Sequence, residues 1–100
     1  MELFQPIAGF FEAIQKDARI SITHIGVYAA LVQYWQASGS RNPMCAYAWE
    51  IMPLAKISAS TTYHKCIRDL HDFGYIFYEP SFKRNVRSKI TIKFISEPNG

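Results

Sequence analysis

The amino-acid sequence predicts an α+β fold, mainly α-helical with a small β-hairpin near the C-terminal end. Four stretches are helical in pattern, and two β-rich stretches separated by a polar, basic segment follow them. The chain has 100 residues, 49% of them hydrophobic and 15% aromatic, which is enough to bury one core. We therefore expect a single domain, with an extra N-terminal helical part over residues 1–19, a core over 22–94 and a tail over 95–100.

The N-terminal part predicts two helices joined by a short link. Pro6 suits the first turn of a helix, and apolar residues then recur at helical spacing to about Asp17. Residues 19–22 alternate in polarity, which indicates a brief strand or extended link, and Thr23 can cap a helix over residues 24–37. A helix that is apolar on most sides is covered on most sides, so the first helix, from this chain or from a partner, is expected to cover part of the second. The second helix has two apolar stripes: Ile25, Tyr28, Ala29, Val32 and Trp35 on one side, and Val27, Leu31 and Tyr34 on the other.

The middle of the chain predicts a loop, a short extended piece and a compact helix. Residues 38–43 contain Gly and Pro and form the loop, residues 44–46 can be extended, and residues 48–55 indicate the helix. Pro53 lies inside that helix and removes a hydrogen-bond donor, so we expect the helix to be short, to be distorted or to start late. Residues 56–58 form the turn that follows.

Residues 58–73 carry the clearest helical pattern, and a hairpin follows them. Ser58 or Ser60 can cap this helix, and Gly74 can end it. Residues 75–78 are β-rich, residues 80–88 are polar and basic, and residues 89–94 alternate strictly, which predicts a hairpin over about 76–94. The apolar positions of the helix are Tyr63, Cys66, Ile67, Leu70 and Phe73.

Positive charge gathers in the second half of the chain. Residues 1–55 carry three basic and four acidic side chains, whereas residues 56–100 carry eight basic and four acidic ones. The segment from Lys83 to Lys93 holds five basic residues and no acidic one. A polyanion is the expected partner of such a region, with an ordinary solvated basic face as the alternative.

The order of helix, helix, three-residue turn, helix, glycine and charged hairpin resembles that of winged helix-turn-helix DNA-binding domains. The stretch ISASTTYHKCIRDLHDFGYI, residues 57–76, is similar to the turn, recognition helix and first wing strand of such regulators. Residues 22–94 can be laid on the same pattern, which also resembles small DNA-binding proteins of bacterial mobile elements. The resemblance implies sequence-specific binding of double-stranded DNA, in transcription regulation or in the replication or excision of a mobile element. Pro53 and a recognition helix less basic than many depart from the family pattern.

The candidate DNA-binding residues follow from the apolar positions of residues 58–73. If Tyr63, Ile67 and Leu70 face the core, the polar residues between them face outward. The major groove of B-DNA admits one α-helix, whose outward side chains can meet base edges and phosphates. Capping is the alternative role for the two hydroxyl residues, and a solvated face is the alternative for the two cations. The candidates are Ser60, Thr61, His64, Lys65 and Arg68 on the helix, with Lys83, Arg84, Arg87 and Lys89 in the wing.

The sequence gives little support to catalysis, metal binding or a membrane span. It has no glycine-rich phosphate loop, nucleophile elbow, CxxC or HxxxH pair, and no apolar run of membrane-spanning length. His64 and Cys66 are two positions apart and point to different faces of a helix. We expect Cys45 and Cys66 to be reduced and buried in a cytoplasmic protein. No enzyme activity, cofactor, metal or small-molecule substrate is expected.

The Phe-rich N-terminal helix adds an expectation about assembly. Together with the second apolar stripe it offers more apolar surface than one small domain easily hides, so we expect a homodimer. The alternative function is a winged helix that assembles proteins through its aromatic N-terminal helix and does not touch DNA.

Overall fold

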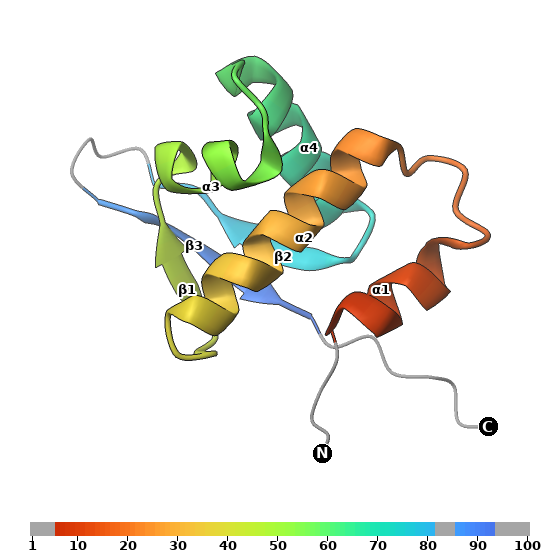
Figure 1. Cartoon of the computed structure of the whole chain (residues 1–100), viewed down its shortest axis with the longest axis horizontal. Coiled ribbons are helices and arrows are strands. Elements are labelled where there is room, and N and C mark those ends of the chain that lie inside the picture. Colours follow the sequence, from red (N-terminus) through yellow and green to blue (C-terminus); the bar gives the residue numbers. More distant parts are fainter. Residues whose placement is uncertain (1–5, 82–85, 94–100) are drawn as a thin grey trace.

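Helices and a small antiparallel sheet make up the fold, as Figure 1 shows. The structure is a computed structural model that describes residues 6–81 and 86–93. The mainly helical α+β architecture expected from the sequence is confirmed. In chain order the elements are α1 (Pro6–Ile14), α2 (Ile22–Ala37), β1 (Met44–Ala46), α3 (Ala48–Ala55), α4 (Ser60–Asp72), β2 (Ile76–Glu79) and β3 (Ser88–Ile92).

The sheet has the order β1-β3-β2, so the last strand is the central one. The predicted hairpin is present as β2 and β3, with Ile76 opposite Ile92, and the short extended piece joins it as a third strand, with Met44 opposite Ile90. These four side chains are buried under the helices. Because side chains alternate along a strand, the residues between them lie on the other, exposed face. Cys45 is one of these residues, so the expectation that both cysteines are buried is wrong for Cys45 and right for Cys66.

Helix α1 covers α2 of its own chain. Phe10 is completely buried, and its ring stacks on that of Tyr28 with 3.9 Å between centroids and 8° between planes. The same ring lies nearly perpendicular to that of Tyr75, with 5.3 Å between centroids and 80° between planes. Of the two options left open by the sequence, packing within the chain is therefore the one observed.

The link between α1 and α2 is a turn held by a polar cluster. Of the two alternatives expected for residues 19–22, the strand is absent, whereas Ser21 is extended just before α2. The Asp17 carboxylate accepts two hydrogen bonds of 2.8 Å from the Arg19 guanidinium and one of 2.6 Å from the Tyr75 hydroxyl. The pKa of Tyr75 is raised to about 12, mainly because the hydroxyl is buried and secondly because it bonds to the Asp17 carboxylate. The Arg19 guanidinium also lies 4.0 Å from the centre of the Phe73 ring. The link is thus fastened to the turn that follows α4.

Two helix starts differ from the sequence expectation. Helix α2 begins at Ile22 and is capped by Ser21 instead of Thr23, because the Ser21 hydroxyl accepts from the backbone N–H of His24. The N-cap of α4 is Ala59, without a side-chain cap bond. Ser60 is already helical, so its hydroxyl lies beyond the capping position.

The ends of α3 and α4 follow local backbone chemistry. Helix α3 includes Pro53 in its last turn, and its C-cap residue is Lys56, whose φ of 61° is left-handed. Beyond α4, Gly74 has a φ of 93°, which a residue with a Cβ adopts only with strain. In the described residues no helix is long and apolar enough to cross a membrane.

Leu70→Ala tests the orientation of α4. Leu70 is completely buried, so truncation leaves a cavity, and we expect the free energy of unfolding to fall by about 2–5 kcal/mol in a denaturant melt. Arg68→Ala, an exposed change on the same helix, should stay within about 0.5 kcal/mol of the parent. Equal stability of Leu70→Ala and parent would show that the wrong face of α4 is assigned to the core.

Candidate nucleic-acid interface

Helix α4 has one buried face and one polar face. Tyr63, Cys66, Ile67 and Leu70 are buried. On the opposite side Thr61, Lys65 and Arg68 follow one another at i, i+4 and i+7, which places them on one stripe, and all three are exposed. Three of the five residues that the spacing predicts to face outward therefore lie along one side of α4.

The residues of the first α4 turn leave polar atoms open to a ligand. Ser60 and Thr61 are exposed, and neither supplies the cap of α4, so the alternative that they are merely capping residues is wrong. His64 is half-buried, and its Nδ1 lies 2.9 Å from the Ser60 carbonyl oxygen, which can only accept. Nδ1 therefore donates, and Nε2 of a neutral ring remains an acceptor.

The two cations of α4 differ in their availability. Lys65 Nζ donates to Asp69 Oδ2 over 2.9 Å, one helical turn away, and this bond raises the pKa of Lys65. Arg68 is exposed and makes no ion pair with any residue of the described ranges. Arg68 is therefore the cation of this face that can meet a phosphate or a base without first giving up a carboxylate.

The wing residues do not all join the α4 face. Arg87 donates two hydrogen bonds to the Glu50 carboxylate, of 3.1 and 3.2 Å, which fastens the hairpin to α3 and balances its charge. This pairing is the main cause of the lowered pKa of Glu50. Lys89 lies on the exposed sheet face, opposite the face that the helices cover. Lys83 and Arg84 lie outside the described residues.

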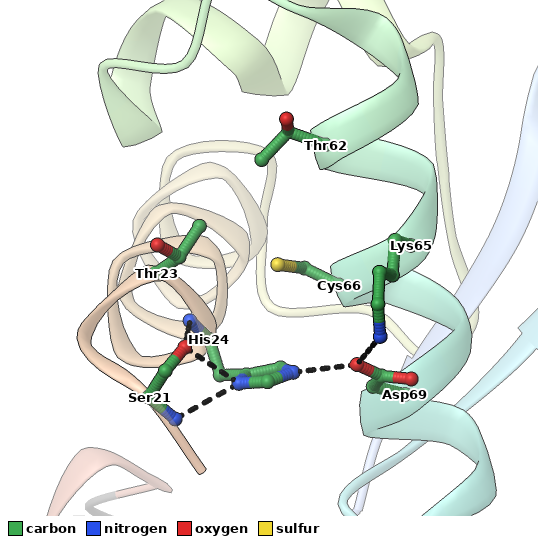
Figure 2. Close-up of a pocket in the computed structure, with 7 residues that line it drawn as sticks. All are labelled: Ser21, Thr23, His24, Thr62, Lys65, Cys66 and Asp69. Carbon is green, nitrogen blue, oxygen red and sulfur yellow. Dashed lines mark hydrogen bonds and ion pairs between the residues drawn. The ribbon is translucent and has the colours of Figure 1, made fainter.

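A pocket of about 220 Å³ lies beside α4, where the first turn of α2 approaches it (Figure 2). His24, only 7% exposed, spans the two helices at its base. Its Nδ1 accepts the Ser21 backbone N–H over 2.9 Å, so Nε2 carries the proton and donates to Asp69 Oδ2 over 2.8 Å. The pocket is lined by Ser21, Thr23, His24, Thr62, Lys65, Cys66 and Asp69.

Sequence reasoning missed this bridge, although one signal for it exists. His24 stands three residues after Ser21, at the position where a capping box usually has Glu or Gln. A His there can cap the helix with one ring nitrogen and reach another element with the other. Asp69 accepts from both His24 and Lys65, and these bonds, with Lys65 the larger cause, lower its pKa.

The residue types of this bridge also occur in hydrolytic triads, but the geometry is that of a helix cap. A general base needs a free nitrogen lone pair to remove the serine proton. The Nδ1 lone pair of His24 accepts the Ser21 backbone N–H, and the Ser21 hydroxyl, which also lies 2.9 Å from Nδ1, accepts the backbone N–H of His24 as the helix cap. Among the residues that the structure describes, no cluster of His, Cys, Asp or Glu could hold a metal ion.

Comparison of the chain with protein-family models, with curated proteins and with solved structures gave no match.

Asp69→Asn tests the bridge between α2 and α4. The variant loses the charge that receives bonds from the exposed Lys65 and the buried His24, so we expect the free energy of unfolding at pH 7 to fall by about 1 kcal/mol. Because folding lowers the pKa of Asp69 from its ordinary 3.8, its contribution is present above pH 3.8 and is lost as the pH falls through the lowered value. Denaturant melts from pH 7 to pH 2 should therefore show the gap between parent and variant closing in acid.

Asp72→Asn is the matched control, since Asp72 is an exposed carboxylate on the same helix with no ion pair among the described side chains. It should shift stability by less than about 0.5 kcal/mol. A gap for Asp69→Asn that stays constant down to pH 2 would mean that this carboxylate does not stabilise the fold through its charge.

Proposed function

We propose that this chain binds double-stranded DNA with sequence preference, by placing the N-terminal half of α4 in the major groove. The observation that carries the proposal is the outward stripe of α4, which begins with hydroxyl side chains, continues through Lys65 and Arg68 and contains no apolar residue. A helix that docks on a protein usually presents apolar or aromatic residues at the centre of the contact. Polar donors and cations are what base edges and phosphates require.

The arrangement of elements supports the same function. Helices α3 and α4 are joined by a short turn, and β2 and β3 follow as a hairpin with β1 completing the sheet. This is the layout that the resemblance to winged helix-turn-helix domains implies. In such domains the second helix of the pair enters the groove while the wing holds the backbone.

Charge along α4 favours its N-terminal half as the part that enters the groove. The acidic residues of the helix, Asp69 and Asp72, both lie in its second half, whereas residues 60–65 contain none. The positive end of the helix dipole adds to this difference. DNA phosphates are therefore attracted by one end of α4 and repelled near the other.

The hairpin supplies a second contact in this proposal. Lys83 and Arg84 stand in the middle of residues 80–87, which connect the two strands in the sequence, so we assign them to phosphates. Arg87 is committed to Glu50, and its main role is to hold the hairpin on α3. The biological setting is transcription regulation or the replication or excision of a mobile element, in the cytoplasm.

The homodimer stays part of the proposal, on weaker grounds than the sequence suggested. Phe10, the centre of the aromatic N-terminal helix, is buried in its own chain, and the partly exposed Phe11 is left on that helix. The alternative function, protein assembly through this helix, needs the same aromatic surface, and the Phe10 part of that surface is buried. DNA binding by α4 therefore has the better support.

Replacing the two α4 cations separately should rank them. Arg68→Ala is expected to weaken binding to the preferred duplex by about 1–3 kcal/mol, because an unpaired cation is removed. Lys65→Ala should cost less, since Lys65 must leave Asp69 before it meets DNA. Fluorescence anisotropy with labelled duplexes at low salt measures both.

Arg41→Ala is the matched control, because it removes the same charge from an exposed side chain of the loop at the other end of α2 (Figure 1). Its affinity should stay near that of the parent. If Arg68→Ala binds no more weakly than Arg41→Ala, α4 does not read DNA.

The double variant Lys83→Ala, Arg84→Ala tests the role of the hairpin in binding phosphates. An ion pair with a phosphate carries no sequence information, so binding to preferred and random duplexes should weaken alike. The slope of log affinity against log salt should fall by roughly 0.9 for each phosphate that the variant no longer neutralises. An unchanged slope and unchanged affinity for random duplexes would remove the hairpin from the DNA interface.

A further inference from the structure

Two aromatic rings form a stack at the start of α3, next to the hairpin. The ring centres of Tyr47 and Trp49 lie 5.2 Å apart, with 14° between their planes. The Arg87 guanidinium of the hairpin lies 4.7 Å from the Tyr47 ring centre. Trp49 is 66% exposed, more than any other aromatic side chain in the part of the chain that the structure describes. The Trp49 indole, which stacks on the Tyr47 ring, is thus exposed to solvent.

The stack is held in place by the chain itself. Tyr47 is the N-cap residue of α3, and its backbone N–H donates to Glu50 Oε1 over 2.8 Å. The same carboxylate receives the two bonds from Arg87, so the helix start, the ring of Tyr47 and the hairpin are fastened to one group. A platform ordered in advance costs little entropy when a ligand binds.

We propose that Trp49 stacks on an unpaired nucleobase, so that the chain binds DNA where a duplex meets a single strand. This inference rests on the proposed function and names its substrate more closely. Every base has a flat π-face that an exposed aromatic ring can receive, whatever the sequence. The bases inside a blunt duplex are stacked on one another and cannot offer that face.

The charge beside the platform favours nucleic acid as the occupant. Of the basic residues that the structure describes in the hairpin, Arg87 contacts Tyr47 directly and Lys89 follows it on β3. A sugar-phosphate backbone could follow these cations while its base lies on Trp49. A protein-docking face would need a continuous apolar stripe, but Leu54, the other large exposed apolar residue of α3, is five positions on and about 140° round the helix.

The test compares two probes with the full chain. One is a blunt duplex, and the other is the same duplex with a single-stranded oligothymidine extension. We expect anisotropy to show roughly tenfold tighter binding to the extended probe, the size of one base–aromatic stack. Trp49→Ala should lose this preference and keep its affinity for the blunt duplex, whereas Leu54→Ala, the matched exposed variant on α3, should keep both.

Tryptophan fluorescence gives an independent signal. Trp35 is only 5% exposed, so a fluorescence change on adding the extended probe is expected to come from Trp49. The blunt duplex should cause a smaller change. In Trp49→Phe the fluorescence change should disappear while part of the preference for the extended probe remains, because phenylalanine can still stack.

Each outcome separates this inference from the proposed function. Equal affinity of the parent for the two probes, or an unchanged preference in Trp49→Ala, overturns the stacking role while duplex binding stands. Binding of free oligothymidine that depends on Trp49, without binding of the blunt duplex, supports the stack and removes the duplex function. If Trp49→Ala alters only self-association in sedimentation, the surface belongs to a second copy and the inference is wrong.

Discussion

The burial of one broad side of α2 against several neighbours is the constraint on which the rest of the structure depends. Val27, Leu31 and Trp35 lie along the middle of that side, with buried Ala30 and Val32 to either side of them, whereas Ala29, Gln33 and Gln36 are exposed. Helix α1 covers it through Phe10, while α3 and α4 contact it elsewhere and the sheet closes the core. Because α2 takes up these neighbours, α4 can use only one of its faces for packing. Its polar face is consequently left outward as a result of how the core is filled.

Polar contacts then set the exact placement of the pieces around this core. Three carboxylates, Asp17, Glu50 and Asp69, each receive bonds from a cation and from at least one further group. Each joins elements that hydrophobic packing alone would leave free to slide: the α1–α2 link to the turn after α4, the hairpin to α3, and α2 to α4. Such partly exposed pairs add modest stability, and their greater effect is on geometry. They also decide which cations remain available for a ligand.

The sequence is a good guide to the helices and a poorer one to the contacts between them. The α4 pattern could be read because its period is long and Gly74 marks its end, whereas β1, with three residues, has too little pattern to reveal a strand. The outward position of Arg68 followed from periodicity. The partners of Arg87 and His24 could not be predicted, because they lie 37 and 45 positions away and depend on how the elements meet in space. The capping error at α2 had a local cause, since a histidine takes the role usually filled by glutamate.

The pairing of Lys65 with Asp69 affects specificity as well as affinity in the proposed complex. When a phosphate draws Lys65 away, Asp69 keeps its bond from His24. Its negative charge then faces the DNA without the positive charge of Lys65 beside it. This cost arises wherever the backbone approaches the second half of α4, whatever the sequence, and it opposes non-specific docking along the whole helix. The cost is smaller when the first turns of α4 lie in the groove and Arg68 is the only side chain of the second half that reaches the DNA. A carboxylate beside the binding face can therefore improve discrimination by penalising the wrong orientation, which added lysines could not do.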